Sequence, residues 1–368
     1  VRDIEGCVAK LAAAGVAIIQ KPAPVRPGGR VIAMILDPDG NEIELLATLS
    51  AAAKRVMNWN VLTIDSREPD RVGRQVEAYD RAKELGGRVV ALTMPVQVPM
   101  NMSFSSFCGL WLLPGWQQIL GVPVAERIQR LQDPDTRVRM LENSLSQAAG
   151  VFRRLADWGD YVIGDTYSAA NEGLKGRVVR DVANERGMSS FGTLLDIVIA
   201  DELKTILWPT PQDDDAESWR MRAELWQDGR AMIGGSDAGA HLDRMCGAPY
   251  PTRWLADCIR GRKLVPVEFA VKMMTSQPAK LFGLVDRGEL REGACADVVV
   301  FNPDEIGSED AMLVTDLPGN SSRLTAGSFG VKRVLVNGVT IVENGVANGA
   351  VPGTVLKSGK DTYTVLAR

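Results

Sequence analysis

One succession of elements constrains the fold of this chain more than any other feature. A strand is expected over Asn58–Ile64 and a nearly all-apolar strand over Arg88–Thr93. Between them, apolar side chains recur at helical spacing, and Gly86-Gly87 ends the helix. Apolar strands of this kind are typical of parallel sheets that are covered on both faces. The pattern therefore predicts a βαβ unit in a parallel sheet.

Three later runs extend this prediction. Strand-like segments are found at Tyr161–Gly164, Thr205–Trp208 and Ala231–Gly235, with helical stretches between them. We therefore expect four or five parallel strands, about half of the eight in a closed (β/α)₈ barrel. From Arg287 onward the chain is β-rich, and Asn337-Gly338 marks a hairpin.

Residues 1–49 read as a separate α-β-β-β fragment. A helix capped by Asp3 and ended by Gly15 is expected first. Three strands should follow, at Val16–Ile19, Val31–Leu36 and Glu42–Leu46. Residues 50–56 then look like a junction.

Composition excludes several classes of function. The 368 residues carry a formal charge of −4, which disfavours a polybasic nucleic-acid binder or attraction to an anionic membrane. No apolar run reaches the ~18 residues of a spanning helix, and the first residues lack signal-peptide order, so we expect a cytoplasmic protein. The five cysteines lack metal-site spacing, and the single histidine, His241, excludes a site built from several imidazoles.

The segment 94–122 is rich in methionine, phenylalanine and tryptophan. Two interpretations stay open. It either covers the core as loop and helix, or forms an apolar substrate wall at the carboxyl end of the Arg88–Thr93 strand, where α/β proteins bind ligands.

The stretch IGGSDAGAHLD, residues 233–243, carries the strongest sign of chemistry. An apolar strand ends in Gly-Gly-Ser and then presents Asp237. A carboxylate at the carboxyl tip of a parallel strand is placed for catalysis. It is equally consistent with capping the next turn or helix.

Longer motifs make residues 57–368 resemble the amidohydrolase superfamily, and most closely its N-acyl-D-amino-acid deacylase (D-aminoacylase-like) branch. Ser236-Asp237-Ala238-Gly239 resembles the end of the last barrel strand of that branch. The helix motif MTSQPAKLFGL at 274–284 and the return RG…ADVVVFNP at 287–303 also match, as do VKRVLVNGVTIVE at 331–343 and Pro352-Gly353.

The resemblance implies a hydrolase of amide C–N bonds, acting on a small N-acyl amino acid or related amide. It implies zinc or another divalent metal that activates water. It also implies that Asp237 contacts the metal, takes the proton from the attacking water and passes it to the leaving amine.

This sequence departs from the family pattern at most metal positions. The His-x-His pair, the bridging ligand and the two later histidines have no counterpart. Asn58, Asn60 and Thr93 stand at strand tips, and asparagine oxygen is a poor ligand for a transition metal. Asp237 is the one family ligand that remains. Asn58, Asn60 and His241 are candidate substrate contacts, while His241 is also consistent with a structural turn.

Residues 1–49 resemble the end of a glyoxalase/bleomycin-resistance (vicinal oxygen chelate) domain, through VRDIEGCVAKLAAAGV and MILDPDGNEIELLA. In that family the glutamate that matches Glu44 binds metal, but its partners are not in this sequence. We therefore expect a glyoxalase-like partial module at 1–49 and a junction at 50–56. A partial amidohydrolase barrel should span 57–285, and a small β-sandwich-type domain 286–368.

Three other groups are weaker candidates. Asp165 and Glu172 form a potential carboxylate pair, although Asp165 also reads as a helix cap. Arg323 is a candidate for binding a substrate carboxylate through its guanidinium fork, or is a surface arginine. Asp213-Asp214-Asp215 reads as a solvated loop that caps a helix.

Two hypotheses follow. In one, the chain is a metal-dependent amidohydrolase, impaired because most ligands are absent. In the other, it is a non-catalytic, truncated and fused relic or interaction module. A half barrel exposes strand edges, so self-association is also expected.

Overall fold

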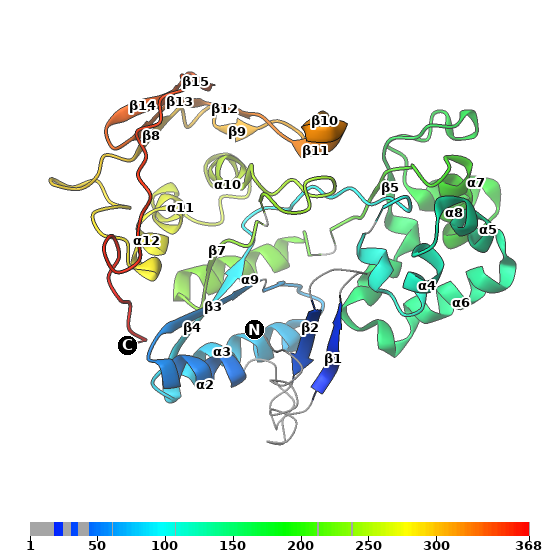
Figure 1. Ribbon diagram of the computed structural model, residues 1–368, viewed down its shortest axis with the longest axis horizontal. Coiled ribbons are helices and arrows are strands. Elements are labelled where there is room, and N and C mark those ends of the chain that lie inside the picture. Colours follow the sequence, from blue (N-terminus) through cyan, green and yellow to red (C-terminus); the bar gives the residue numbers. More distant parts are fainter. Residues whose placement is uncertain are drawn as a thin grey trace.

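The computed structural model of the protein describes residues 18–24, 31–35, 44–60, 62–106, 108–211, 213–236 and 238–367. The predicted helix between Asp3 and Gly15 lies outside these residues. In Figure 1 a sheet with its helices lies beside a body of helices, and the C-terminal strands form a further layer. Among the described residues, no helix is long and apolar enough to cross a membrane.

A three-stranded parallel sheet confirms the predicted βαβ unit. Its strands, in the order β3-β4-β7, are β3 (Val56–Asn60), β4 (Arg88–Thr93) and β7 (Ala231–Ile233). Helix α3 (Pro69–Glu84) makes the crossover from β3 to β4. The bounds of β4 coincide with the prediction, because its apolar run is bordered by Gly87 and buried along most of its length.

The N-terminal elements differ from the expected α-β-β-β order. β1 (Ile18–Pro24) and β2 (Val31–Ile35) form an antiparallel pair. The predicted third strand is wrong, because a helix, α2 (Glu44–Ala53), begins there and runs into the expected junction. Its alanine-rich sequence favours a helix. Ala47 and Ser50 lie on one face and are fully buried.

Ser50 explains why α2 is fixed against the sheet. Its Oγ lies 2.6 Å from the carbonyl of Arg55 and accepts a hydrogen bond from the amide of Arg88 at 2.7 Å. Gly87 adds to this fit, since a Cβ there would meet the amide nitrogen of Ala51 at 2.7 Å. The helix is therefore packed onto the start of β4.

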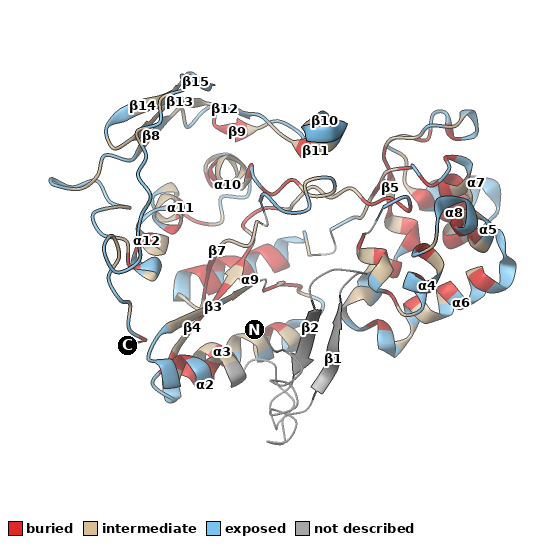
Figure 2. Ribbon diagram, in the orientation of Figure 1, coloured by how far each residue is buried: buried red, intermediate tan, exposed pale blue. Residues whose placement is uncertain are grey.

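The chain between β4 and β7 builds a helical body with its own core. Its α-helices are α4 (Trp116–Leu120), α5 (Val124–Gln132), α6 (Pro134–Leu145), α7 (Val179–Arg186) and α8 (Ser190–Ala200). Short 3-10 helices lie at Gly109–Leu112, Gln147–Ala156, Trp158–Asp160 and Ala169–Asn171. Buried side chains gather along α8 and its neighbours (Figure 2).

Two of the predicted parallel strands lie in this helical body instead. β5 (Val162–Ile163) and β6 (Leu207–Trp208) pair with each other in antiparallel fashion, apart from the main sheet. The prediction of four or five parallel strands is therefore wrong, and the described residues contain three. Apolar runs of two to four residues carry no information on strand direction, which only tertiary packing supplies.

A second hydrophobic core is formed where helices pack against the parallel sheet. It joins residues of β4 and β7 to α9 (Ala216–Asp228), α10 (Tyr250–Ile259) and α11 (Val267–Met274). Helix α12 (Ser276–Phe282) follows. The structure is therefore α/β in class, with helices on a parallel sheet and a largely helical segment inserted between β4 and β7.

The last part of the chain is β-rich, as predicted. A four-stranded antiparallel sheet, in the order β15-β14-β13-β8, contains β8 (Val298–Phe301), β13 (Val331–Val336), β14 (Val339–Glu343) and β15 (Val346–Ala347). Shorter pairs are formed by β9 (Gly307–Ser308) with β12 (Ser328–Phe329) and by β10 (Met312–Leu317) with β11 (Ser321–Thr325). A 3-10 turn at Pro318–Asn320 joins the second pair.

The predicted hairpin at Asn337-Gly338 joins β13 to β14. Both residues have positive φ, 48° and 80°. A two-residue turn with left-handed backbone at both positions matches the twist of antiparallel strands, and asparagine and glycine adopt it at the least cost.

Candidate functional site

A cavity of about 530 Å³ lies at the carboxyl ends of all three parallel strands. Thr63 follows β3, Thr93 ends β4, and Gly235 follows β7, and all three line it. Ligands of α/β proteins bind at this edge of the sheet. The volume is within the range of small-molecule sites, about 300–1,000 Å³.

One wall of the cavity is apolar. It is formed by the stretch that leaves β4, together with the segment around Met245. Met94, Val96, Val98 and Met100 all line the cavity. Of the two interpretations of segment 94–122, the substrate wall fits these residues. The core-covering interpretation fits the later ones, because Phe104, Leu110 and Trp116 are buried in the helical core.

The facing wall comes from the helical body. Arg154, Leu155, Asp157, Asp160 and Tyr161 line this side. Tyr161 is 2% exposed, and its hydroxyl donates to the carbonyl of Leu155 at 2.9 Å. Burial raises the pKa of this phenol well above its ordinary value, so Tyr161 stays protonated at neutral pH.

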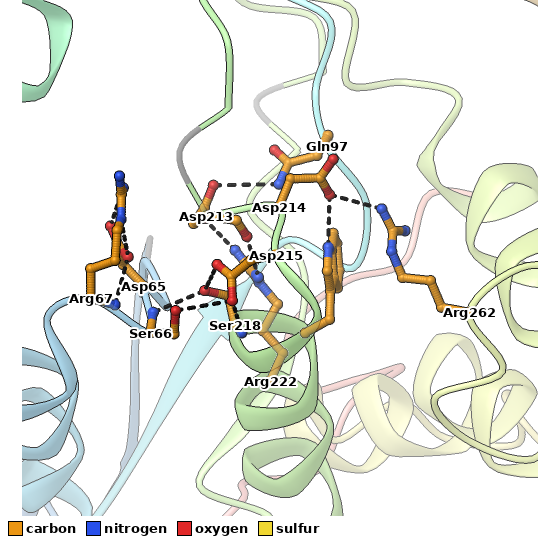
Figure 3. A network of polar contacts seen from close by, with 11 residues as sticks. Asp65, Ser66, Arg67, Gln97, Asp213, Asp214, Asp215, Ser218, Arg222 and Arg262 are labelled. Carbon is orange, nitrogen blue, oxygen red and sulfur yellow. Dashed lines mark hydrogen bonds and ion pairs between the residues drawn. The ribbon is translucent and has the colours of Figure 1, made fainter. Parts of the chain in front are cut away.

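The aspartate run 213–215 forms an ordered polar network beside the cavity (Figure 3). Asp213 forms an ion pair with Arg222 and accepts a hydrogen bond from the side-chain amide of Gln97 at 3.3 Å. The Arg222 side chain is only 4% exposed, and burial lowers the pKa of its guanidinium. Its Nε is buried without a hydrogen-bond partner. The negative charge of Asp213 therefore offsets the energetic cost of burying the Arg222 charge.

Asp214 binds a different pair of groups. It accepts hydrogen bonds from the indole of Trp219 at 2.7 Å and from Arg262 at 2.8 Å. The guanidinium carbons of Arg222 and Arg262 lie 4.4 Å and 4.0 Å from the centroid of the Trp219 ring. These distances are those of cation–π contacts, which fix the ring and both arginines together.

Asp215 caps helix α9, as predicted for this run. Its carboxylate accepts from the amide of Ser218 at 2.9 Å and from the Ser218 hydroxyl at 2.6 Å. These hydrogen bonds lower the pKa of Asp215 to about 2. The Ser66 hydroxyl, after β3, donates a hydrogen bond to Asp215 at 2.9 Å. The capping carboxylate therefore also links the start of α9 to the loop that follows β3.

Asp65 is the carboxylate that enters the cavity from the β3 side. It accepts from the amide of Arg67 at 3.0 Å and from the Arg67 Nε and Nη2 atoms at 2.9 Å and 2.8 Å. The side-chain hydrogen bond from Arg67 is the main reason why the pKa of Asp65 is lowered. This carboxylate is therefore ionised and engaged, and Figure 3 shows it beside Ser66.

The structure describes only part of the predicted set of site residues. Asp237 lies outside the described residues, as does the side chain of Asn60, and both stay predictions. Asn58 is exposed on β3, where it pairs with Val90. Thr93, at the tip of β4, lines the cavity and is 1% exposed.

His241 and Arg323 lie away from the cavity lining. His241 is exposed with φ 51°, and its carbonyl accepts hydrogen bonds from the amides of Arg244 and Met245, both at 2.9 Å. Arg323 forms a two-pronged ion pair with Asp316 at 2.8 Å across the β10–β11 hairpin. Its fork is therefore used within the protein.

The weaker carboxylate candidates are also accounted for. Asp165 ion-pairs with Lys175 at 2.5 Å, and Glu172 is exposed. The side chain of Glu44 is outside the described residues.

The side chains that the structure describes do not form a catalytic metal centre. Within the described ranges, no three histidine, cysteine, aspartate or glutamate side chains are grouped so that they could hold a metal ion. The four aspartates of the cavity wall come from three segments, with Asp65 after β3, Asp157 and Asp160 in the helical body, and Asp213 before α9. A zinc site needs three or four converging protein ligands.

Several residues of the cavity and of the polar network beside it have no site signal in the sequence. Arg222 and Trp219 look like ordinary residues of an amphipathic helix, and Gln97 like a loop residue. The aspartate run was visible, but its three different partners depend on the fold. Only the run of apolar residues after β4 could have placed part of this site.

Together these features define an α/β protein with a ligand-sized cavity at the carboxyl edge of its parallel sheet. The model of the amidohydrolase family matches residues 28–342, and the chain belongs to that family. A second model, of the glyoxalase/bleomycin resistance protein/dioxygenase superfamily, matches residues 1–45. The two matches overlap on 28–45.

Curated relatives agree with this assignment. An N-acyl-D-glutamate deacylase of Alcaligenes xylosoxydans xylosoxydans is 36% identical over 115 residues, which are 30% of this chain and 22% of the relative. A D-aminoacylase of the same organism is 30% identical over 189 residues, 50% of this chain and 34% of the relative. The matched parts thus span about a third of these relatives or less.

One solved structure shows a weak overall likeness to this chain. The N-acyl-D-glutamate deacylase of Bordetella bronchiseptica, complexed with zinc and a phosphonate inhibitor, is 20% identical. The likeness covers 83% of this chain and 52% of that protein, with a TM-score of 0.41.

Proposed function

We propose that this chain is an amidohydrolase of the N-acyl-amino-acid deacylase type, which binds a small amide in the cavity at the carboxyl edge of β3, β4 and β7. One observation carries the proposal. Gly235 lines the cavity at the end of β7, and Asp237 is two residues further along the chain. The family match and the deacylase relatives support an amide substrate.

Asp237 is the proposed catalytic carboxylate. It would take a proton from the attacking water as the water oxygen bonds to the amide carbon, and then give that proton to the nitrogen as the C–N bond breaks. The products are a carboxylic acid and an amine. Tyr161 and the paired aspartates of the wall would shape the site around this reaction.

The proposal includes impaired catalysis in the chain as it stands. The family resemblance implies divalent metal, whereas the sequence has one histidine and its described residues contain no cluster of three side chains that could hold a metal ion. Asp237 is the one family ligand found in the sequence. We therefore expect weak metal binding, and substrate binding that exceeds turnover.

A second candidate rests on the same observation. A non-catalytic relic or interaction module would keep the cavity and the scaffold without the metal donors. It differs from an impaired enzyme in one measurable respect, which is that turnover would be zero and independent of Asp237.

The architecture proposed for this function keeps the boundaries predicted from sequence. Residues 57–285 would be the C-terminal half of a (β/α)₈ barrel and 286–368 a β-sandwich-type domain. Residues 1–49 would be a glyoxalase-like fragment, joined to the barrel at 50–56. A cytoplasmic location belongs to the same proposal.

The C-terminal sheet supports a further proposal, self-association. β8 is at the edge of its sheet, and Val299 and Val300 are 55% and 47% exposed on opposite faces. Exposed apolar edge strands are templates for pairing with another chain. Light scattering after size exclusion should give more than one chain mass, and a sharp monomer would contradict it.

Zinc content and hydrolysis together test the function. Purified protein is analysed for zinc and assayed with N-acetyl-D-amino acids, alongside Asp237→Ala and, as a matched acid on the following loop, Asp243→Ala. We expect less than one zinc per chain and slow hydrolysis that Asp237→Ala abolishes and Asp243→Ala retains. Hydrolysis that is absent, or unchanged in Asp237→Ala, would contradict the proposal and favour the non-catalytic module.

A further inference from the structure

A second pocket, of about 500 Å³, lies where helix α10 meets the C-terminal strands. Its lining comes from α10 and the loop that follows it, from β9 and β12, and from the segment after β4. Figure 1 shows β9 beside α10. The pocket shares Val96 and Gln97 with the cavity at the carboxyl edge of the parallel sheet, and its other lining residues are different. It is therefore a separate candidate site, with a volume in the range of small-molecule sites.

The pocket carries an excess of positive charge. Three arginines and one aspartate line it, which are Arg253, Arg260, Arg262 and Asp257. Arg262 forms ion pairs with Asp257 at 3.1 Å and with Asp214 at 2.8 Å, so its charge is matched. Among the residues that the structure describes, Arg253 and Arg260 form no ion pair with a carboxylate. Two guanidinium charges thus remain for an anion.

Backbone carbonyls hold these two arginines in place. Arg260 donates hydrogen bonds from both of its Nη atoms, to the carbonyls of Pro303 and Ile306. Arg253 donates from Nη2 to the carbonyl of Glu309 at 2.9 Å. A neutral carbonyl orients a guanidinium without cancelling its net charge, and each guanidinium keeps some of its five N–H donors for a ligand. Groups that are oriented before binding lose less freedom when an anion arrives.

An aromatic ring forms another side of the pocket. Phe329 in β12 lines the pocket and is 48% exposed. Its ring covers Gly307 of the paired strand β9, where a Cβ would lie 2.6 Å from the ring atoms Cε2 and Cζ. This close fit positions the ring, while nearly half of the side chain stays accessible. Accessible aromatic rings stack on planar groups such as nucleobases.

The charges and the ring together favour a phosphate ester over a carboxylate. A phosphate monoester carries a charge of about −1.5 to −2 near neutral pH and three acceptor oxygens, so it can bind two guanidinium groups at once. A carboxylate carries one charge and two oxygens, which a single arginine fork satisfies. The pocket is also larger than a phosphate group alone requires, and Phe329 offers a surface to a planar group.

We propose that this pocket binds a nucleoside monophosphate, with the phosphate on Arg253 and Arg260 and the base against Phe329. The site lies outside the cavity proposed for amide hydrolysis and does not depend on catalysis by Asp237. The Asp237→Ala protein should therefore bind the nucleotide as the wild type does, and loss of hydrolysis and loss of nucleotide binding are separate results.

Calorimetric titration of the full chain tests the ligand class. AMP carries both the base and the phosphate, inorganic phosphate lacks the base, and adenosine lacks the phosphate. Adenosine-5′-carboxylic acid replaces the phosphate by a carboxylate. We expect AMP to bind about tenfold tighter than each of the other three, because base stacking and the second charge both contribute. Absence of AMP binding, or an equal affinity for any of the other three, would overturn the proposal.

Arginine variants locate the phosphate. Arg253→Gln and Arg260→Gln should each weaken AMP binding about tenfold, because each removes a charge-assisted pair of hydrogen bonds. Arg253→Lys keeps the charge and should retain most of the affinity. Arg55→Gln is the matched control, since Arg55 also donates to backbone carbonyls, those of Ala53 and Lys54, and is not part of the pocket lining. Wild-type AMP affinity in Arg253→Gln, or an equal loss in Arg55→Gln, would overturn the assignment.

Phenylalanine variants locate the base. Phe329→Leu keeps an apolar side chain on Gly307 and removes the ring, so AMP should bind about as weakly as inorganic phosphate does. The affinity for inorganic phosphate should stay unchanged, and Phe329→Tyr should retain the affinity for AMP. Phe282→Leu is the matched control, because Phe282 is 62% exposed and is not part of the pocket lining. If Phe329→Leu binds AMP as tightly as the wild type, the base does not stack on this ring and the proposal fails.

Discussion

Arg222 and Asp213 form an ion pair in which the arginine side chain is 4% exposed and the aspartate 21%. The guanidinium also donates to the backbone carbonyl of Asp213 at 2.9 Å. The two residues thus join helix α9 to the loop that borders the cavity. Loss of the ion pair destabilises the protein more when the arginine is the residue left behind, because its charge has almost no contact with water.

The first prediction follows from this asymmetry. Asp213→Asn leaves the arginine charge buried without its counter-charge, and should lower the free energy of unfolding by about 2–3 kcal/mol. Arg222→Met removes the buried charge and leaves an aspartate that is 21% exposed and still accepts a hydrogen bond from the Gln97 side chain. The loss should therefore be smaller, about 1 kcal/mol. Urea unfolding measures both.

Asp228→Asn is the matched control. Asp228 pairs with Arg230 at the end of the same helix, but both side chains are about a third exposed. Exposed pairs contribute between about 0 and 1 kcal/mol. A loss for Arg222→Met that equals or exceeds that for Asp213→Asn would contradict the proposed asymmetry.

The second prediction concerns acid stability. Hydrogen bonds from Ser218 lower the pKa of Asp215 to about 2, below the 3.8 of an unperturbed aspartate. A depressed folded-state pKa gives stability that is present above about pH 4 and is lost as the pH falls through about 2. Asp215→Asn keeps the cap acceptor and removes the charge.

The measured quantity is the difference in unfolding free energy between the wild type and Asp215→Asn. Because the carboxylate is largely exposed, we expect it to be less than about 1 kcal/mol at pH 6. It should shrink toward zero near pH 2. A difference that is constant over this range would show that the carboxylate charge does not contribute.

The sequence predicted the sheet better than the site, and the reason is physical. The strand Arg88–Thr93 and helix α3 follow from local apolar periodicity, and both were predicted correctly. The antiparallel pairing of β5 with β6 depends on contacts between distant residues. Local pattern also misled at Glu44, where alternating apolar residues suggested a strand and the following alanines formed a helix.

The site shows the same division. The apolar wall after β4 could be anticipated, because one short apolar segment at the carboxyl end of a parallel strand supplies most of it. The network of Asp213, Asp214 and Asp215 could not, because each carboxylate binds a partner from a different segment. Asp237 is predicted from a motif and stays a prediction.

A pair of glycines gives the third prediction. Gly73 in helix α3 and Gly86 after it both have open space where a Cβ would be placed, but Gly86 has φ 78°. Gly73→Ala should raise the unfolding free energy by about 0.5–1 kcal/mol, because alanine loses less backbone freedom in a helix. Gly86→Ala should lower it by about 1 kcal/mol, because left-handed backbone is strained for alanine. Thermal unfolding measures the melting temperatures of both variants. Equal shifts would show that the left-handed backbone of Gly86 does not disfavour alanine.

The last prediction concerns the loop that carries Asp237. Gly247 packs so closely on the chain after β7 that a Cβ would lie 1.9 Å from the carbonyl oxygen of Ser236. Because that oxygen belongs to the residue directly before Asp237, Gly247→Ala must displace the segment that presents the proposed catalytic carboxylate. We expect a stability loss of about 1–3 kcal/mol from overpacking and a loss of hydrolysis at least as complete as in Asp237→Ala.

Gly353→Ala is the matched control, since nothing lies within 4 Å of its Cβ position and its backbone is not left-handed. It should leave both stability and hydrolysis unchanged. The informative comparison is ligand binding by the folded Gly247→Ala protein at a temperature well below its melting point. If its affinity for N-acetylglycine and its hydrolysis rate both equal those of the wild type, the carboxylate after Ser236 does not act in this cavity. In that case the cavity would bind its ligand without help from the end of β7.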